Sequence, residues 1–583
     1  MLLGRTWRAG LRFSRNSSTT ATPRPRWQRY LRRVGFMGVG VGVVYTVDRN
    51  YNASALGRNL RTLWACALIT ADYKLNFTPE KSDQIPQLHE RVAEVMFNLF
   101  TSNGGLYIKI GQAIGANAAF LPRPVQVKFG TLFDDAPQIP YSDILSVFKS
   151  EFGRPPDGPD GVFEFFDEKA IASASIAQVH KARLRPEPGE TEGQWVAVKI
   201  QKPDVAKQTE WDLGVYRIVM WLFEKVAFDL PVYFVVDFIS EHLRRELDFE
   251  LEANNARRTA EFVAADPDLS QTVYIPRVYL ELTTKRVMTA EWIDGVRLSD
   301  RQGILRLVGG ALHGGARGVM EPMVELFSAQ MFRWGWVHCD PHPGNVLIRP
   351  HPQRPSRPQL VLLDHGLYVQ LTEDFRRDWC SIWEGMLAGE WSVVERVTRK
   401  WGVGMPDLFA SAVLMRPTRL GRGRPPPDPT KPKRKPIDEM TNYERSVMMK
   451  AQLKGFLLDT DRMPKVLIFL LRNMRMVQGN NQALNSPVNR IKITGFAASR
   501  GLTRDRNAAL RVRLYDYWHY TRFRMFMFSI DVVFWLSKAR QWTWRWLGMG
   551  AVGLGFEDEI ERSVRGLAKS SFGVDVGPEA FQG

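Results

Sequence analysis

The sequence has 583 residues, 44% of them apolar, which is enough for one large domain with extensions or for several small domains with real cores. Its three cysteines, Cys66, Cys339 and Cys380, lie too far apart in the sequence for a zinc cluster or a disulfide framework. The net charge of +17 resembles that of nucleic-acid-binding proteins, but nine arginines within residues 1–33 supply about half of it. Nucleic-acid binding would therefore rest on charge alone, and we expect no nucleic-acid partner.

Residues 1–33 are rich in Arg, Ser and Thr, and the first acidic residue of the chain is Asp48. Leu2, Trp7 and Leu11 can share one face of a helix. A basic, acid-free segment of this kind is typical of a mitochondrial presequence, and we predict a mitochondrial protein. A disordered basic tail is the alternative interpretation.

Residues 34–47 form an uncharged apolar run. As a helix it would span about 21 Å, less than the roughly 30 Å of a hydrocarbon core. Gly38 and Gly42 have the small-xxx-small spacing of closely packed membrane helices. The run is therefore either a short transmembrane span or a buried or interfacial helix.

Residues 80–155 are predicted to form a helical region. Apolar residues recur there at spacings of three and four, as Leu88, Val92, Val95 and Leu99 do, and Tyr141 to Phe152 should form a further helix. The region contains Lys109-Ile110-Gly111-Gln112. Taken alone, a Lys and a Gln on an apolar helix normally mark its solvated edge.

Two paired strands are predicted at 162–166 and 172–182. The small-residue turn Ala172-Ser173-Ala174-Ser175 lies at the start of the second segment. The strand Trp195 to Ile200 follows and contains Lys199 in a Val-Ala-Val-Lys run, the position of the phosphate-binding lysine in kinase-like sites. The turn would then cover the nucleotide. Its Cβ atoms restrict the close backbone approach that glycine allows, so phosphate binding should differ from that of a glycine-rich loop.

We expect a helical insertion over about 204–241 and an acidic helix from Glu241 to Asn255. Glu252 on that helix is the candidate ion-pair partner of Lys199, although charged residues on a helix are usually solvated. Strands at 273–280 and 286–291 follow. They lead to Glu291 and Trp292, the expected hinge that binds the adenine edge.

One long helix from Gly303 to Trp334 should precede the segment Val337 to Asn345 (VHCDPHPGN). In it, Asp340 is the candidate catalytic base. Asn345 lies five positions later, and Asp364 of an Asp-His-Gly triplet follows two short strands, the order of a base and two metal ligands in a kinase-like site. Asn345 and Asp364 provide the oxygen ligands that Mg²⁺ prefers.

Beyond Asp364 the pattern is helical to about residue 400 and again from 442 to 477. The basic, Pro-rich segment 416–436 is predicted to be a disordered surface loop, with contact to acidic lipid as the alternative. Residues 510–547 mix arginines with Tyr, Trp and Phe. This mixture favours an interfacial membrane helix, and docking onto the preceding lobe fits nearly as well.

Six segments, in this order, resemble the motifs of the UbiB/ADCK family of atypical kinases: KIGQ at 109, ASASIAQVHKA at 172, VAVKIQKP at 196, ELDFELEAN at 246, HCDPHPGN at 338 and LLDHG at 362. The resemblance implies an α+β, protein-kinase-like bilobal fold with an N-terminal helical extension and an α-rich C-terminal region. The corresponding domains are the presequence (1–33), the apolar helix (34–47), the extension (80–155), the small lobe with its insertion (156–295), the large lobe (296–480) and a C-terminal basic-aromatic region (481–583).

The resemblance also implies regulatory roles for Lys109 and Gln112, with Lys109 meeting Glu246 and Asp248 where a protein substrate would lie. The extension would then block protein phosphorylation, and the Ala-rich turn would favour ADP over ATP. Family members support coenzyme Q and lipid homeostasis, and the presequence suggests the mitochondrial inner-membrane branch. Two departures, Ala177 at a position often held by Gly and His365 for the Phe of Asp-Phe-Gly, put turnover in doubt.

We therefore expect an atypical kinase or ATPase that binds ATP or ADP with Mg²⁺. The alternative is a catalytically weak pseudokinase that acts as a nucleotide-gated lipid-binding or scaffolding protein. The expected partners are mitochondrial membrane lipids, with cardiolipin as a candidate, and quinone or lipid intermediates. A homo-oligomer is compatible with the sequence.

Overall fold

A computed structural model describes residues 26–116, 122–129, 138–186, 188–189, 191–310, 314–414, 439–457, 459–502, 510–547, 556–559, 562 and 566. Contacts divide the chain into two compact units, Met1–Gly57 and Arg58–Gly583. Most of the predicted presequence and the whole predicted loop at 416–436 lie outside the described residues.

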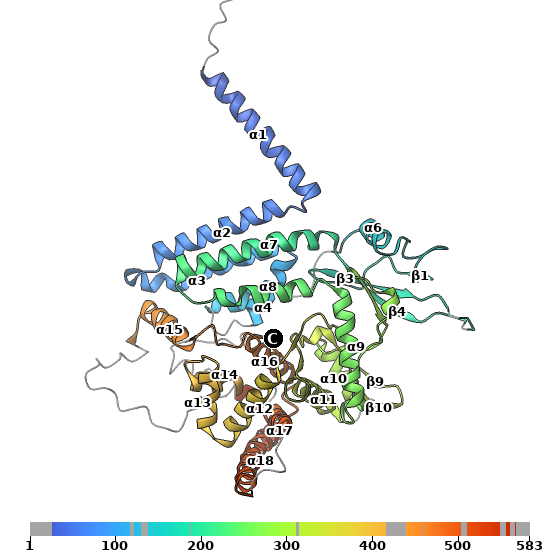
Figure 1. Ribbon diagram of the computed structural model, residues 1–583, viewed down its shortest axis with the longest axis vertical. Coiled ribbons are helices and arrows are strands. Elements are labelled where there is room, and N and C mark those ends of the chain that lie inside the picture. Colours follow the sequence, from blue (N-terminus) through green and yellow to red (C-terminus); the bar gives the residue numbers. More distant parts are fainter. Residues whose placement is uncertain are drawn as a thin grey trace, which may run out of the picture. The chain divides into compact units, whose positions relative to one another are not determined.

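The first unit contains one long helix, α1 (Arg26–Tyr51), which includes the apolar run 34–47 (Figure 1). In its last turn, the Asp48 carboxylate accepts hydrogen bonds from the backbone N–H groups of Leu56 and Gly57, both at 2.9 Å, and so satisfies the first turn of the next helix. Within the described part of the chain, no helix combines the length and apolarity needed to cross a membrane.

The second unit begins with the helical extension. Its helices are α2 (Ala55–Asn76, from Arg58 on), α3 (Ile85–Asn103), α4 (Leu106–Ala116), α5 (Arg123–Phe129) and α6 (Tyr141–Phe152), with a 3₁₀ turn at Pro79–Gln84. Phe100 packs edge-on against Phe129 with ring centroids 5.3 Å apart, at the centre of a small core. The predicted bounds of α6 are confirmed.

A five-stranded sheet forms the small lobe, in the order β1-β3-β4-β6 with β2 paired to β3. Its strands are β1 (Phe165–Phe166), β2 (Ala172–Ser173), β3 (Ala177–Arg183), β4 (Trp195–Gln201) and β6 (Val287–Glu291). Val196, Val198 and Ile200 of β4 are fully buried, and Val198 and its neighbours pack in one core with Phe148 of α6. The alternation leaves Lys199 on the opposite face of the strand.

The insertion after β4 consists of α7 (Pro203–Leu222), a π-helical turn (Phe223–Phe228), a 3₁₀ turn (Tyr233–Val235) and α8 (Val236–Arg245). The predicted single helix over 241–255 is wrong, because α8 ends at Arg245 and α9 (Phe249–Ala265) begins after a turn. Asp248 has extended backbone angles and caps α9. This break places Glu246 between two helices.

A second sheet, in the order β5-β10-β9-β7, belongs to the large lobe. It contains β5 (Val273–Tyr274), β7 (Val296–Arg297), β9 (Val346–His351) and β10 (Arg354–Leu362), while β8 (Trp336–His338) pairs with β11 (Tyr368–Gln370). The predicted strand 273–280 is shortened to β5, which pairs with β10, and a 3₁₀ turn follows at Leu280–Leu282.

The predicted helix over 303–334 is interrupted. It consists of α10 (Arg301–Gly310), α11 (Gly315–Ala329) and a π-helical turn (Gln330–Trp334). Gly314 and Gly315 have positive φ angles of 91° and 58°, a conformation that ends a helix and that glycine adopts readily.

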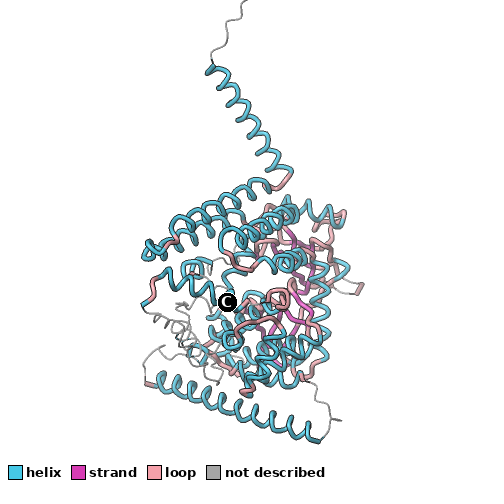
Figure 2. Tube along the Cα trace, turned by 60° about the vertical axis from the view of Figure 1, so that its left-hand side comes forward, coloured by secondary structure: helices cyan, strands magenta, loops and turns pink. Residues whose placement is uncertain are grey.

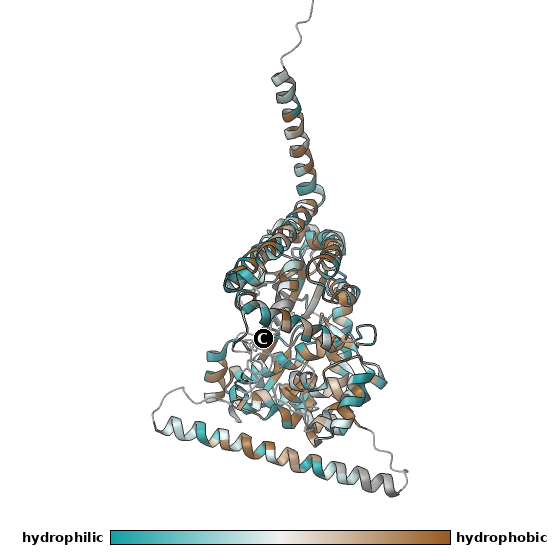
Figure 3. Cartoon of the chain, turned by 90° about the vertical axis from the view of Figure 1, so that its left-hand side faces the viewer, coloured by the Kyte–Doolittle hydropathy of each residue, from teal (hydrophilic) through white to brown (hydrophobic). Residues whose placement is uncertain are grey.

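The rest of the lobe is helical: α12 (Glu373–Ala388), α13 (Trp391–Lys400), α14 (Pro406–Leu414), α15 (Asn442–Phe456), α16 (Leu467–Ala483), α17 (Arg490–Gly501) and α18 (Leu510–Trp546). Figure 2 shows the strands lying together on one side, with helices making up most of the rest, and in Figure 3 α18 lies along the edge of the lobe as a long helix with interspersed apolar and polar residues. Trp379 and Trp383 of α12 are fully buried in their core. The predicted α+β class is confirmed.

Removing the Asp212 carboxylate tests how the extension is held. Arg58 of α2 and Asp212 of α7 form an ion pair at 2.5 Å with side chains 8% and 1% exposed. Asp212→Ala should lower the free energy of unfolding by about 3–5 kcal/mol, because it leaves a buried guanidinium without its carboxylate. Chemical denaturation measures the loss.

Asp237→Ala is the matched control, because its partner Arg217 and Asp237 itself are 50% and 76% exposed. This variant should change the unfolding free energy by no more than about 1 kcal/mol. Equal losses in the two variants would contradict the assigned role of the buried pair.

Candidate functional site

Lys199 of β4 lies between two carboxylates. Its Nζ donates to Glu252 Oε1 and Oε2 at 2.6 and 2.8 Å and to Asp364 Oδ2 at 3.2 Å. Glu252 is in the first turn of α9 and is 1% exposed. Burial alone would lower the pKa of Lys199, but Asp364 and Glu252 outweigh it and raise the pKa, so the lysine stays charged. The structure thus brings together three of the predicted site residues.

The β9–β10 hairpin places Asn345 next to Asp364. Asn345 directly precedes β9, and Val346 pairs with Leu362 at the end of β10. The Leu363 N–H donates to the Asn345 carbonyl at 2.9 Å, and Asp364 follows. The Gly366 N–H donates to Asp364 Oδ1 at 3.0 Å. Burial would raise the pKa of Asp364, but Lys199 and Lys109 hold it well below its usual range.

His338 connects the loop that carries Asp340 to the loop that carries Asp364, although sequence reasoning did not single it out. It is fully buried, its Nδ1 accepts from the Asp340 N–H at 2.9 Å, and its Nε2 lies 2.9 Å from the Asp364 carbonyl oxygen. Because Nδ1 accepts, the hydrogen-bond network assigns the proton to Nε2. A neutral histidine therefore fixes the distance between the two loops.

Arg472 of α16 contacts Asp340 and was also missed. Its Nη2 donates to Asp340 Oδ1 at 2.9 Å, and the two side chains are 11% and 17% exposed. Burial would raise the pKa of Asp340, but the charges of Arg472 and then Lys109 lower it. In the sequence, the only hint of this contact was an Arg-Asn pair inside an apolar run.

Two further side chains of α16 hold the same loop. Asn473 Nδ2 donates to the His338 carbonyl at 2.6 Å, and Asn480 Nδ2 donates to the Pro341 carbonyl at 3.1 Å. Asn473 is fully buried. With Arg472, α16 therefore contacts the loop on both sides of Asp340.

Lys109 of α4 pairs with Glu246, with Nζ 2.6 Å from Oε1. Burial would lower the pKa of Lys109, but Glu246, Asp340 and Asp364 raise it, so the ammonium charge acts on both site carboxylates. A Cβ added to Gly366 would lie 3.5 Å from Glu246 Cγ, which puts Glu246 beside the Asp-His-Gly triplet. The extension therefore reaches the site.

Asp248, the other expected partner of Lys109, caps helix α9. The Asp248 carboxylate accepts from the N–H groups of Glu250 and Leu251 at 3.1 and 3.3 Å. The first N–H groups of a helix have no acceptor within it, and a preceding Asp supplies one. The side chain of Gln112, on α4, lies outside the described residues.

The small-residue turn joins β2 to β3. Ala172 and Ser173 pair with β3, and the Ala174 N–H donates to the Ala177 carbonyl at 2.8 Å. The Ser175 side chain is 7% exposed, and its Oγ has no hydrogen-bond partner among the described residues. A buried hydroxyl of this kind is costly unless another group satisfies it.

Both predicted hinge residues use their backbone N–H groups internally. The Glu291 N–H donates to the Arg277 carbonyl at 2.8 Å, and the Trp292 N–H donates to the Trp195 carbonyl at 3.1 Å. The Glu291 carboxylate accepts from the Tyr274 hydroxyl at 2.5 Å. An adenine at this edge would therefore have to use other atoms of the segment.

His365, the departure from Asp-Phe-Gly, is 1% exposed and fully hydrogen-bonded. Its Nδ1 lies 2.9 Å from the Tyr368 hydroxyl and its Nε2 lies 3.2 Å from the Leu362 carbonyl oxygen. Burial, with the nearby His338, lowers the pKa of His365 to about 3. It is therefore a neutral side chain that fixes the triplet.

The donor set fits a nucleotide with Mg²⁺. Asn345 and Asp364 offer oxygen ligands suited to a hard cation that keeps part of its water shell. The Lys199 ammonium group, which Glu252 holds in place, offers a positive charge to phosphate oxygens. The Ser175 hydroxyl has no hydrogen-bond partner among the described residues. This fit rests on the chemistry of the side chains.

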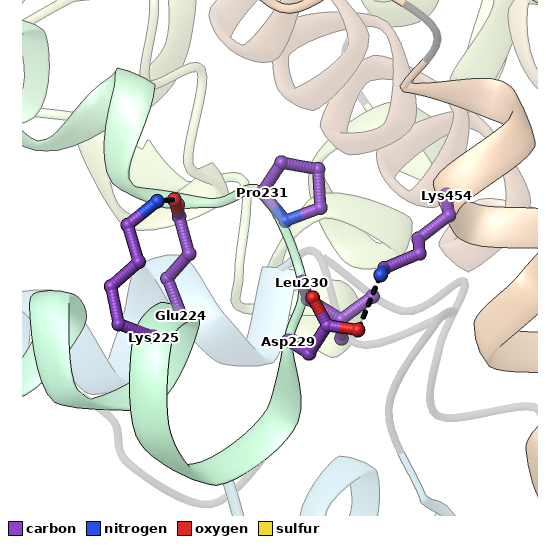
Figure 4. Close-up of a pocket in the computed structure, with 6 residues that line it drawn as sticks. All are labelled: Glu224, Lys225, Asp229, Leu230, Pro231 and Lys454. Carbon is purple, nitrogen blue, oxygen red and sulfur yellow. Dashed lines mark hydrogen bonds and ion pairs between the residues drawn. The ribbon is translucent and has the colours of Figure 1, made fainter.

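A separate polar pocket is lined by Glu224, Lys225, Asp229, Leu230, Pro231 and Lys454. Figure 4 shows Asp229 and Lys454 pointing toward each other, and they form an ion pair that links the insertion to α15. None of the predicted site residues lines this pocket. We assign the chemistry to the site around Lys199.

The partner of Lys109 can be tested by unfolding measurements on variants. Lys109→Met combined with Glu246→Gln should be non-additive, with a coupling of about 0.5–3 kcal/mol, because the two side chains form one ion pair. Lys109→Met combined with Asp248→Ala should be additive within about 0.5 kcal/mol, because Asp248 caps α9. A larger coupling to Asp248 than to Glu246 would contradict this assignment.

The role of Arg472 can be tested in the same way. Arg472→Ala should cost about 3–5 kcal/mol, because Asp340 is left buried with no directly bound cation. The same substitution in an Asp340→Asn background should cost much less, because an amide carries no charge to compensate. Arg462→Ala is the control, since its pair with Asp459 is 70% and 37% exposed. An equal loss in both backgrounds would show that Arg472 acts only through packing.

Comparison with known proteins identifies a family for the chain. Residues 131–398 match the family model described as the ABC1 atypical kinase-like domain. An ABC1 family protein of Schizosaccharomyces pombe is 40% identical over 82% of this chain and 84% of its own. ABC1 family protein lscO of Purpureocillium lilacinum is 36% identical over 91% of each chain. Among solved structures, the Rv3197–erythromycin complex of Mycobacterium tuberculosis is 25% identical, with a TM-score of 0.36 over 55% of this chain and 76% of that one.

The Lys199–Glu252 pair, Asp340, Asn345 and Asp364 thus lie in a chain that aligns with ABC1 family proteins over most of its length. The chain belongs to the ABC1 (UbiB/ADCK) family of atypical kinases and has its α+β, kinase-like bilobal fold.

Proposed function

We propose that this protein is a mitochondrial atypical kinase or ATPase that binds a nucleotide with Mg²⁺ and acts on a lipid or quinone intermediate. The observation that carries the proposal is Lys199 held by Glu252 and Asp364 at 2.6–3.2 Å. This arrangement places one cation and two carboxylates where phosphate and metal charges would meet. The mitochondrial location and the link to coenzyme Q and lipid homeostasis come from residues 1–33 and from the family resemblance.

The contacts of each site residue indicate its role. Glu252 holds the Lys199 ammonium group toward the phosphates, and Asn345 with Asp364 would hold Mg²⁺, which when bound neutralises charge on the transferring phosphoryl group. Asp340 Oδ1 is occupied by Arg472 at 2.9 Å, so Oδ2 is the oxygen that can accept a proton from an acceptor hydroxyl or a water. His338 holds the loop of Asp340 and the loop of Asp364 at a fixed distance from each other.

Lys109 argues against a protein acceptor. Its ammonium group is bonded to Glu246 and its charge acts on Asp340. The family resemblance implies that a protein substrate would lie at this position. A small or flexible acceptor, such as one that comes from a membrane, needs less space than a protein. This is the basis for proposing a lipid or quinone intermediate as the substrate class.

The contact between Lys199 and Asp364 favours a second candidate function. Lys199 already contacts Asp364 directly at 3.2 Å, and the low pKa of Asp340 makes it a weak base. A pseudokinase that uses nucleotide only to stabilise a lipid-binding conformation has these properties as well. Turnover separates the two candidates.

Nucleotide binding and hydrolysis by the purified full chain test the proposal, with and without vesicles that contain cardiolipin and with quinone analogues. Asp340→Asn should bind Mg²⁺-nucleotide normally and hydrolyse it about 100-fold more slowly, because only proton transfer is lost. Asp364→Asn should weaken Mg²⁺-dependent binding by about ten-fold or more, because a charged ligand is removed.

Asp237→Asn is the control, because its carboxylate is 76% exposed and pairs with Arg217 of the insertion, outside the site. Nucleotide-dependent stabilisation without turnover in any condition would favour the pseudokinase. Full complementation of a null strain by both Asp340→Asn and Asp364→Asn would exclude nucleotide chemistry at this site.

A further inference from the structure

The C-terminal helix α18 has two opposed apolar faces. Its inner face is a stripe with alternating spacings of four and three, and these residues are at most 6% exposed: Phe523, Met527, Ile530, Phe534, Ser537 and Gln541. Phe523 packs edge-on against Phe496 of α17 with ring centroids 5.6 Å apart. This stripe docks the helix on the large lobe.

The outer face of α18 repeats the same spacing on the opposite side of the helix. Its large apolar side chains are 41–77% exposed: Met525, Phe528, Val532, Trp535, Trp542 and Trp546. The helical period of 3.6 residues keeps these positions on one side over about six turns. An apolar row of this length is unusual on a surface that faces only water.

Polar contacts fix the helix with this row facing outward. Lys492 of α17 contacts Asp531 at 2.6 Å, Lys538 donates to the Asn485 carbonyl at 2.9 Å, and Arg522 donates to the Ala388 carbonyl at 3.2 Å. Because the inner face is already packed, presenting the outer row requires no refolding. The row is therefore a preformed surface.

The charge of α18 identifies the occupant. Residues 510–547 contain six arginines and one lysine against two aspartates. Asp531 is paired with Lys492 and Arg540 with Glu559, which leaves the helix with an excess of positive charge. Each Arg or Lys close to an anionic membrane contributes roughly 1 kcal/mol of attraction. Trp side chains favour the boundary between headgroups and acyl chains, and basic residues flanking such a row are typical of a helix lying in that boundary.

We propose that the outer face of α18 docks flat on an anionic lipid bilayer surface, with Phe528, Trp535 and Trp542 inserted below the headgroups. A bilayer needs no shape complementarity, which suits a single convex row of large side chains. This inference does not depend on the nucleotide chemistry proposed above. It concerns the surface of the large lobe, whether or not that lobe turns over nucleotide.

Flotation of the full chain with vesicles tests the proposal, using phosphatidylcholine alone and phosphatidylcholine mixed with phosphatidylserine. The double variant W535E/W542E should lower partitioning into the anionic vesicles by about ten-fold or more. The matched control W211E/W221E makes the same charge change at α7 residues that are 50% and 48% exposed, and it should partition like the wild type. Equal losses for the two double variants would overturn the proposal.

A local probe separates α18 from other lipid-binding segments such as α1. An environment-sensitive dye at Phe528→Cys, in a Cys66→Ser background with Cys339 and Cys380 buried, should shift to the blue on adding anionic vesicles. The same dye at Leu305→Cys, on α10, should not respond. An unchanged signal at position 528 while the chain floats, or a blue shift that follows protein concentration without lipid, would overturn the proposal. The second result would instead identify a contact between copies of the chain.

Discussion

The ion pair between Lys199 and Glu252 is the interaction on which the arrangement of this protein depends. Lys199 points away from the buried Val198 and Ile200 because it lies on the other face of β4. Glu252 can meet it only because α9 starts anew at Asp248, which orients the first turn of α9 toward the sheet. Asp364 completes the contact from the large lobe. One lysine therefore joins a strand, a helix and a hairpin from both lobes, and any shift between the lobes changes the charge balance at the site.

The loop that carries Asp340 is held by hydrogen bonds from the C-terminal half of the lobe. Arg472, Asn473 and Asn480 of α16 contact Asp340, His338 and Pro341, respectively. Helix α17 packs on α11 and α12, and α18 packs on α12 and α17. The region beyond residue 460 is therefore part of the site's framework. A membrane contact at α18 would act on the same rigid group of helices that positions Asp340.

Local patterns were sufficient to predict the strand of Lys199 and the α6 helix, because β alternation and helical spacing can be read from neighbouring residues. The sequence also led to Glu252, 53 positions from its partner. Other features depend on tertiary contacts. The break between α8 and α9, the capping role of Asp248 and the contact of Arg472 with Asp340 across 132 positions have no local signature. Likewise, one periodicity of α18 fits both docking on the lobe and contact with a membrane, so sequence alone left both alternatives open. The structure shows the docked face and an exposed apolar face on the other side of the helix.

Access to Asp340 depends on how the extension is attached. Lys109 on α4 pairs with Glu246, which follows α8 of the insertion, while Arg58 of α2 is buried against Asp212 of α7. Extension and insertion thus share two ion pairs, and α4 also packs against α7. Because breaking the buried Arg58 pair costs about 3–5 kcal/mol, Lys109 cannot be withdrawn by moving the extension alone. An acceptor that reaches Asp340 must therefore either fit beside Lys109 or move the extension and the insertion together.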